Sequence, residues 1–184
     1  SEPPKPSENS KIFATYAYGT NSEILCDGST TLTSGETMMS GSNYSYSTME
    51  SAVVGNCVTT IGERAFNVFP QLRAVTIPNS VTNIGSNAFY KCSSLTSATI
   101  GSGVTSIKES AFERCSGLTS VIIPNSVTYI DSFAFYNCSG LTSIRCLATT
   151  PPTLGSSVFD YTPIASGTGT IYVPSGSVEA YKSA

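Results

Sequence analysis

The stretch from Pro78 to Cys146 consists of three nearly identical units. They read PNSVTNIGSNAFYKCSSLTSATI, GSGVTSIKESAFERCSGLTSVII and PNSVTYIDSFAFYNCSGLTSIRC. The units begin at Pro78, Gly101 and Pro124, so the period is 23 residues. A period between roughly 20 and 30 residues is typical of a solenoid, in which each unit stacks on the one before it. This restricts the chain to an architecture of stacked turns.

Apolar residues recur at fixed positions in every unit, which predicts a continuous core. The end of each unit alternates apolar and polar residues, as a short half-buried strand does. Stacking makes these strands parallel and places them about 4.8 Å apart on one face. The spacing I-x-x-x-A-F-x-x-C predicts a helical or 3-10 turn on the opposite side. In the first unit the apolar positions are Val81, Ile84, Ala88, Phe89, Cys92, Leu95, Ala98 and Ile100.

The pattern L-x-x-V-x-I-P-x-S-V-T-x-I-G-x-x-A-F-x-x-C resembles the BspA-like (Treponema pallidum-type) leucine-rich repeats of bacterial surface proteins. The resemblance covers residues 57–146 cleanly and extends toward both ends in weaker form. It implies an α/β repeat fold, a right-handed leucine-rich-repeat solenoid with short parallel strands on its concave face. It also implies a secreted or cell-surface protein whose relatives are linked with adhesion to host proteins. No catalytic residues come with this family.

We expect one domain with four segments. Residues 1–10 are a polar, proline-rich linker or stem. Residues 11–48 are a β-rich N-terminal capping region with candidate hairpin strands at Ile12–Tyr18 and Glu23–Cys26, or a fragment of a separate upstream domain. Residues 49–146 are the repeats, and six strands should end near Val54, Ile77, Ile100, Ile123, Cys146 and Val173.

Residues 147–184 are a divergent last repeat and the start of a C-terminal cap. The strand-plus-proline motif recurs there after 27 residues, so four residues are inserted, mostly around Tyr161–Thr170. The tail after it predicts a short helix with Ser177 as its N-cap.

Composition argues against several classes of function. The net charge of −3 speaks against nucleic acid as a partner, since that needs basic patches. No apolar run approaches the roughly 18 residues that a membrane span requires. The chain has no histidine, which removes the usual general base for a nucleophile, so we expect no enzyme, cofactor or metal. We expect a secreted or cell-surface protein, with any lipid anchor on a segment outside this sequence.

The cysteines predict core residues rather than a reactive site. Cys92, Cys115 and Cys138 share one inward column, so we interpret them as free buried thiols, with a disulfide or metal role as the alternative. Cys146 replaces an inward isoleucine and also indicates core. Cys26 and Cys57 lie in the N-terminal region, where an oxidising compartment would permit a disulfide between them.

The outward strand positions form the candidate binding surface. Serine and threonine suit exposed strands in any case, so this surface predicts either a hydroxyl-lined site for an extracellular protein or glycan, or a structural spacer without a ligand. We expect a monomer or weak self-association. Tyr90, Tyr129, Phe133, Tyr136 and Tyr161 form an alternative patch on the convex side. The candidate ligand-binding residues are Arg73, Thr76, Thr96, Ser97, Thr99, Thr119, Ser120, Ile122, Thr142, Ser143 and Arg145.

Overall fold

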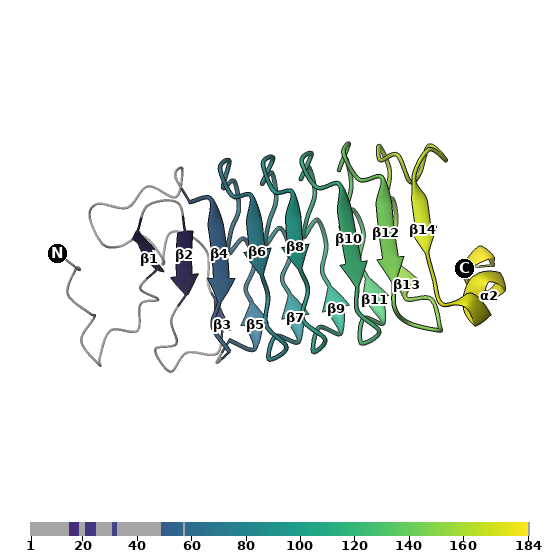
Figure 1. The fold of residues 1–184 in the computed structure, drawn as a ribbon, viewed down its shortest axis with the longest axis horizontal. Helices are drawn as coiled ribbons and strands as arrows, with labels where there is room; N and C mark the ends of the chain where they lie inside the picture. The colour runs from purple at the N-terminus through teal and green to yellow at the C-terminus, as the bar shows by residue number, and fades with distance from the viewer. Residues whose placement is uncertain (1–14, 19–20, 25–30, 33–48, 57, 184) are drawn as a thin grey trace.

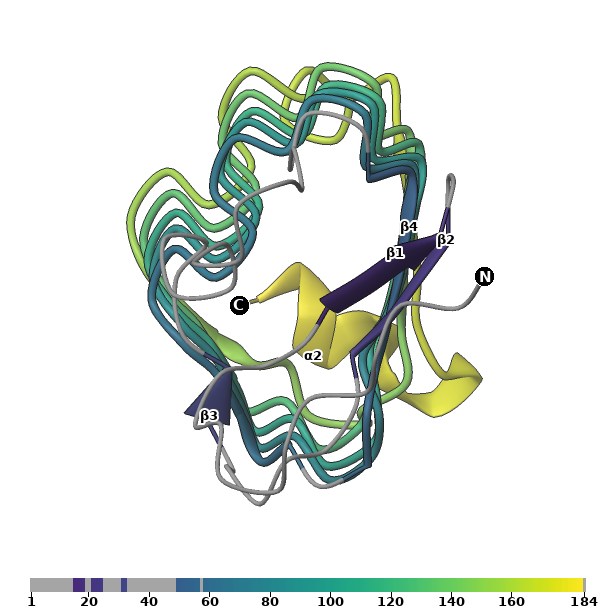
Figure 2. The same cartoon turned by 90° about the vertical axis from the view of Figure 1, so that its left-hand side faces the viewer.

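The chain winds into a solenoid whose turns stack along the long axis of the molecule (Figure 1). This computed structural model describes residues 15–18, 21–24, 31–32, 49–56 and 58–183. Seen along the tube, successive turns nearly superpose (Figure 2). The predicted parallel-strand solenoid with a 23-residue period is therefore confirmed.

The six expected repeat strands lie side by side on one wall of the tube (Figure 1). Ala74 pairs with Ser97, and Ser120 pairs with Ser143, so neighbouring turns are one repeat apart. The last step is 27 residues, since Ile144 pairs with Ile171. The strands are β4 (Ser51–Val54), β6 (Ala74–Thr76), β8 (Ser97–Thr99), β10 (Ser120–Ile123), β12 (Ser143–Cys146) and β14 (Thr170–Tyr172).

This wall is divided into two hydrogen-bonded sheets rather than one. β8 ends a sheet that includes β4 and β6, and β10 begins a second sheet with β12 and β14. The break follows β8, whose inward residue Ala98 is smaller than Val75, Val121 and Ile144 in the same column. Ala52 in β4 is equally small, and β4 stays paired with β6. Ala98 is 9% exposed and Ala52 is 1% exposed, so the core is less completely covered at the turn where the break lies.

A second ladder of two-residue strands, which was not predicted from the sequence, forms a separate wall of the tube. Each strand pairs in parallel with its neighbour, for example Ile84 with Ile107. The isoleucines point inward and are buried, so this ladder encloses the core from another side. Its strands are β3 (Thr31–Leu32), β5 (Thr60–Ile61), β7 (Asn83–Ile84), β9 (Ser106–Ile107), β11 (Tyr129–Ile130) and β13 (Thr153–Leu154).

The segment around each A-F pair is a series of turns, so the expected helical or 3-10 turn is wrong. Two residues per turn have positive φ, such as Asn87 at 56° and Lys91 at 58°, and a right-handed helix cannot pass through them. The backbone N–H groups of Asn87, Phe89 and Lys91 donate to the carbonyls of Glu109, Ala111 and Glu113 in the next turn. Hydrogen bonds between turns therefore alternate with short bonds inside the segment, such as the Tyr90 N–H to the Asn87 carbonyl, in place of a continuous helix.

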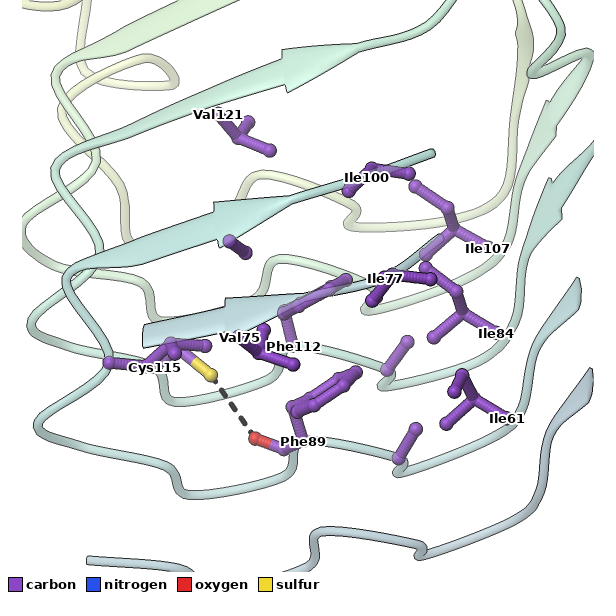
Figure 3. Close-up of a cluster of buried hydrophobic side chains, with 14 of the residues drawn as sticks. Ile61, Val75, Ile77, Ile84, Phe89, Ile100, Ile107, Phe112, Cys115 and Val121 are labelled. Carbon is purple, nitrogen blue, oxygen red and sulfur yellow. Dashed lines mark hydrogen bonds between the residues drawn. The ribbon is translucent and has the colours of Figure 1, made fainter. Parts of the chain in front are cut away.

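The core is a column of stacked side chains (Figure 3). The rings of Phe89 and Phe112 are nearly parallel, with their centroids 4.9 Å apart, and Phe66, Phe135 and Phe159 continue the stack. Phe69 occupies the position that cysteine takes in later turns. Its ring meets the Phe66 ring edge-on, with the centroids 5.5 Å apart, and fills space near the N-terminal end of the core. The repeated apolar columns therefore form one continuous core.

The predicted hairpin near the N-terminus is confirmed within the described residues, and its second strand begins two residues earlier than expected. β1 (Thr15–Tyr18) pairs antiparallel with β2 (Asn21–Ile24). β2 then pairs in parallel with β4, so the hairpin extends the wall of long strands at one end of the tube (Figures 1 and 2). Its role as a cap stays a prediction.

At the other end, a 3-10 helix η2 (Ser175–Ser177) leads into helix α2 (Val178–Lys182), as expected. Ser177 stands at the N-cap position but makes no side-chain capping bond there. One inserted residue precedes β13, because Ile130 pairs with Leu154. The other three lie between residues 161 and 170, which confirms the predicted place of most of the insertion.

Candidate functional site

The outward-facing side of the six long strands is the candidate site, and we call it the strand face. Paired residues on parallel strands project from the same side of a sheet, so the register defines two outward columns. One column is mainly serine and the other is mixed. They are Ser51, Ala74, Ser97, Ser120, Ser143 and Thr170, and then Val53, Thr76, Thr99, Ile122, Arg145 and Tyr172.

The structure brings all eleven predicted residues together along this wall. Ten of them are exposed and Ser143 is half-buried. The seven that lie within the strands belong to the two columns, while Arg73, Thr96, Thr119 and Thr142 precede the strands. That these residues bind a ligand stays a prediction.

Some hydroxyl groups of the strand face form hydrogen bonds between adjacent turns. The Thr96 Oγ1 donates to the Arg73 carbonyl oxygen at 3.1 Å. The Thr142 Oγ1 donates in the same way to the Thr119 carbonyl oxygen at 3.3 Å. These exposed bonds tie adjacent turns together, so the two threonines have a structural role whether or not a ligand binds.

The two arginines of the strand face have different surroundings. Arg73 forms an ion pair with Glu50, with Nε and Oε2 3.8 Å apart. The Arg145 guanidinium lies over the Tyr172 ring, 5.3 Å from its centroid. Glu50 and Tyr172 are not among the residues predicted from the sequence, although the 27-residue spacing of the last strand aligns Tyr172 with Arg145.

The predicted aromatic patch is only partly assembled. Phe133 and Tyr136 meet edge-on at 5.5 Å, and Tyr136 and Tyr161 at 5.1 Å. The Tyr161 side chain is 70% exposed. Tyr90 and Tyr129 are engaged elsewhere: the Lys91 ammonium lies over the Tyr90 ring, and the Tyr129 hydroxyl donates to Asp131. The cluster that remains is Phe133, Tyr136 and Tyr161.

The cysteine column is confirmed as free buried thiols. The Cys115 Sγ donates to the Phe89 carbonyl oxygen at 3.1 Å (Figure 3), and Cys92 and Cys138 make the equivalent bonds to Phe66 and Phe112. Each thiol therefore donates a hydrogen bond to a buried carbonyl as well as filling space, a role that its apolar column did not reveal.

Burial makes these thiols poor nucleophiles. It raises the pKa of Cys92 and Cys138 to about 12, and it also raises the pKa of Cys115. The reactive thiolate is correspondingly scarce at neutral pH. The described residues contain no cluster of three potential metal ligands. Cys26 and Cys57, the candidates for a disulfide, lie outside the described residues.

None of the helices in the described part of the chain has the length and apolar character to cross a bilayer.

Comparison with known proteins points to one family. A family model for the BspA type leucine rich repeat region matches residues 37–165 in six copies, which is more than half of the chain. No curated protein matches the sequence.

Several solved bacterial structures are similar. A leucine rich cell surface protein from Faecalibacterium prausnitzii is 30% identical with a TM-score of 0.62, over 72% of this chain and 34% of that one. A leucine-rich repeat protein from Bacteroides capillosus is also 30% identical, with a TM-score of 0.53, over 72% of this chain and 98% of that one. A leucine-rich repeat protein from Eubacterium ventriosum shares the fold at 22% identity and a TM-score of 0.66, over 86% of this chain and 40% of that one.

This chain thus spans about a third of the Faecalibacterium protein and two fifths of the Eubacterium protein. The family match covers the repeats that the register of the strands defines. The chain belongs to the BspA-type leucine-rich repeat family.

Proposed function

We propose that this protein is a non-enzymatic binding module of a secreted or cell-surface protein, and that its strand face holds an extracellular protein or glycan. One observation carries the proposal: two adjoining outward columns run across six strands, and most of their side chains are exposed and able to form hydrogen bonds. The similar Faecalibacterium protein is described as a cell surface protein, which supports the location.

The strand face is small, so each copy should bind weakly. Six strands about 4.8 Å apart and three residues wide offer roughly 240 Å², against roughly 800 Å² per partner in a standard interface. Display of many copies on a surface would compound weak contacts into firm attachment.

A multivalent binding screen tests this proposal. The domain is displayed in many copies on beads and exposed to extracellular matrix proteins and host glycans. The double variant Thr99→Arg/Ser120→Arg places two long cations on exposed strand positions, so it should abolish a saturable interaction and leave the circular dichroism spectrum unchanged.

A matched control adds the same two arginines away from the strand face. Ser102 and Ser139 are exposed on turns, so Ser102→Arg/Ser139→Arg should bind as the unaltered protein does. Equal binding by both double variants would contradict the proposed face.

A structural spacer is the second candidate, because the Thr96 and Thr142 hydroxyls are already bonded to neighbouring turns. It predicts no saturable partner in the same screen when the fold is verified. That result would favour the spacer over the binding module.

A further inference from the structure

We propose that the C-terminal half of the strand face binds a carboxylate-bearing, partly apolar segment of an extended peptide through Ile122, Arg145 and Tyr172. This inference rests on the proposed function and narrows it to one ligand chemistry and one half of the face. The 23-residue step aligns Ile122 with Arg145, and the longer 27-residue step to the last strand adds Tyr172.

The register places the three side chains in one outward column. Ile122 pairs with Arg145, and Arg145 pairs with Tyr172, on neighbouring parallel strands. Neighbouring strands are about 4.8 Å apart, so the three cover about 10 Å along the solenoid axis. Ile122 is 53% exposed and Tyr172 is 49% exposed. These residues therefore form one contiguous surface rather than scattered side chains.

Arg145 differs from every other arginine in the sequence. Arg64, Arg73 and Arg114 each have a glutamate oxygen within 3.8 Å of their Nε. Arg145 has no carboxylate within ion-pair distance among the described residues, and its guanidinium lies over the Tyr172 ring instead. The positive charge of Arg145 is therefore free to pair with a ligand, and the Tyr172 ring holds the arginine side chain in place. A guanidinium held in this way loses less freedom when it forms a two-pronged bond with a carboxylate.

The residues around Arg145 indicate which groups should flank the carboxylate in the ligand. Thr76 and Thr99 occupy the same column in earlier turns, where a polar β-branched residue suits an exposed strand. Ile122 and Tyr172 present apolar surface there instead. Ser120 and Ser143 lie beside them in the other column and offer hydroxyl groups. An acidic side chain flanked by apolar side chains on the same side of an extended peptide fits this arrangement, and the apolar contacts favour a peptide over a glycan.

The test uses a pair of extended ten-residue peptides attached to streptavidin for multivalent display. In the first, glutamate and phenylalanine alternate at every second position with serine between them, so both point to one side of the strand. In the second, glutamine replaces glutamate. The full chain should bind the glutamate peptide in surface plasmon resonance, and Arg145→Gln should weaken that binding about tenfold.

The control variant removes the same charge elsewhere. Arg64 is exposed on a turn, so Arg64→Gln should leave binding of the glutamate peptide within about twofold, as expected for a distant exposed charge. Tyr172→Leu should weaken it as well, because the ring no longer positions the guanidinium. Urea midpoints of the three variants show whether each one folds.

Equal affinity for the two peptides, or equal loss in Arg64→Gln and Arg145→Gln, would overturn the inference. So would binding of heparin, lost in Arg145→Gln, without binding of the glutamate peptide, because the anion site would then serve a sulfated glycan. If a matrix partner is lost in Thr99→Arg/Ser120→Arg but kept in Arg145→Gln, the proposed function stands and this inference fails.

Discussion

Ten residues in the described turns have φ between 54° and 61° without being glycine. They occur in two columns, one containing Asn87 and the other Lys91, and their conformation directs backbone N–H groups toward the next turn. Asparagine tolerates this conformation, whereas a β-branched residue is strained in it. Val68 has φ of 58°, and Phe133 and Tyr161 place large rings in the same columns. The hydrogen bonds between turns therefore outweigh local backbone preference.

Replacing Val68 with asparagine should stabilise the protein by roughly 1 kcal/mol, because the strained φ is relieved. The Val68 side chain is 44% exposed, so little buried surface is lost, and its N–H bond to the Tyr90 carbonyl is kept. Urea denaturation measures the change. Val53, which is 47% exposed on strand β4, provides the matched control. Val53→Asn should lower stability slightly, and a gain of equal size there would contradict the role of φ.

At the scale of the element, each turn is held by three kinds of contact with its neighbours. These are the wall of long strands, the ladder of two-residue strands and the bonds between turn segments. The phenylalanine stack lies inside them, with rings inclined by at most 13° from one another. A unit in the middle of the stack therefore depends on both of its neighbours.

Phe112→Ala should destabilise the protein by about 3–5 kcal/mol, since the ring is fully buried between two others. Phe159→Ala should cost clearly less, because Phe159 is half-buried and, among the described residues, has a ring neighbour, Phe135, on one side only. Chemical denaturation of both variants gives the comparison. Equal losses would show that position in the stack does not matter.

At the scale of the whole molecule, ionisation couples to the stability of the entire core. Cys92, Cys115 and Cys138 share one buried column, and burial raises the pKa of each. In the unfolded chain these thiols ionise near pH 9. Above that pH the unfolded state loses protons that the folded state keeps, so the free energy of unfolding falls as pH rises toward the folded pKa values.

Between pH 8 and pH 10, each of these three thiols should lower the free energy of unfolding by about 1 kcal/mol. Urea denaturation in the presence of a reducing agent at both values measures the total. In Cys115→Ala the fall in the free energy of unfolding between pH 8 and pH 10 should be smaller by the contribution of one thiol. This holds whatever the stability of that variant at pH 8. A decrease unchanged by this substitution would show that other groups cause the alkaline effect.

The period, the parallel long strands and the residues of the core could all be predicted from the sequence, because every turn repeats the same buried columns. Ile84 and Phe89 could be assigned to the core in this way, and Thr99 and Ser120 to the outward face. Tertiary structure alone decided the ladder of short strands, the positive φ of Asn87 and Lys91, and the break between β8 and β10. It also decided that Arg73 meets Glu50 while Arg145 meets Tyr172. These features depend on hydrogen bonds and side-chain distances between stacked turns, and a pattern of apolar spacing records only which residues face inward.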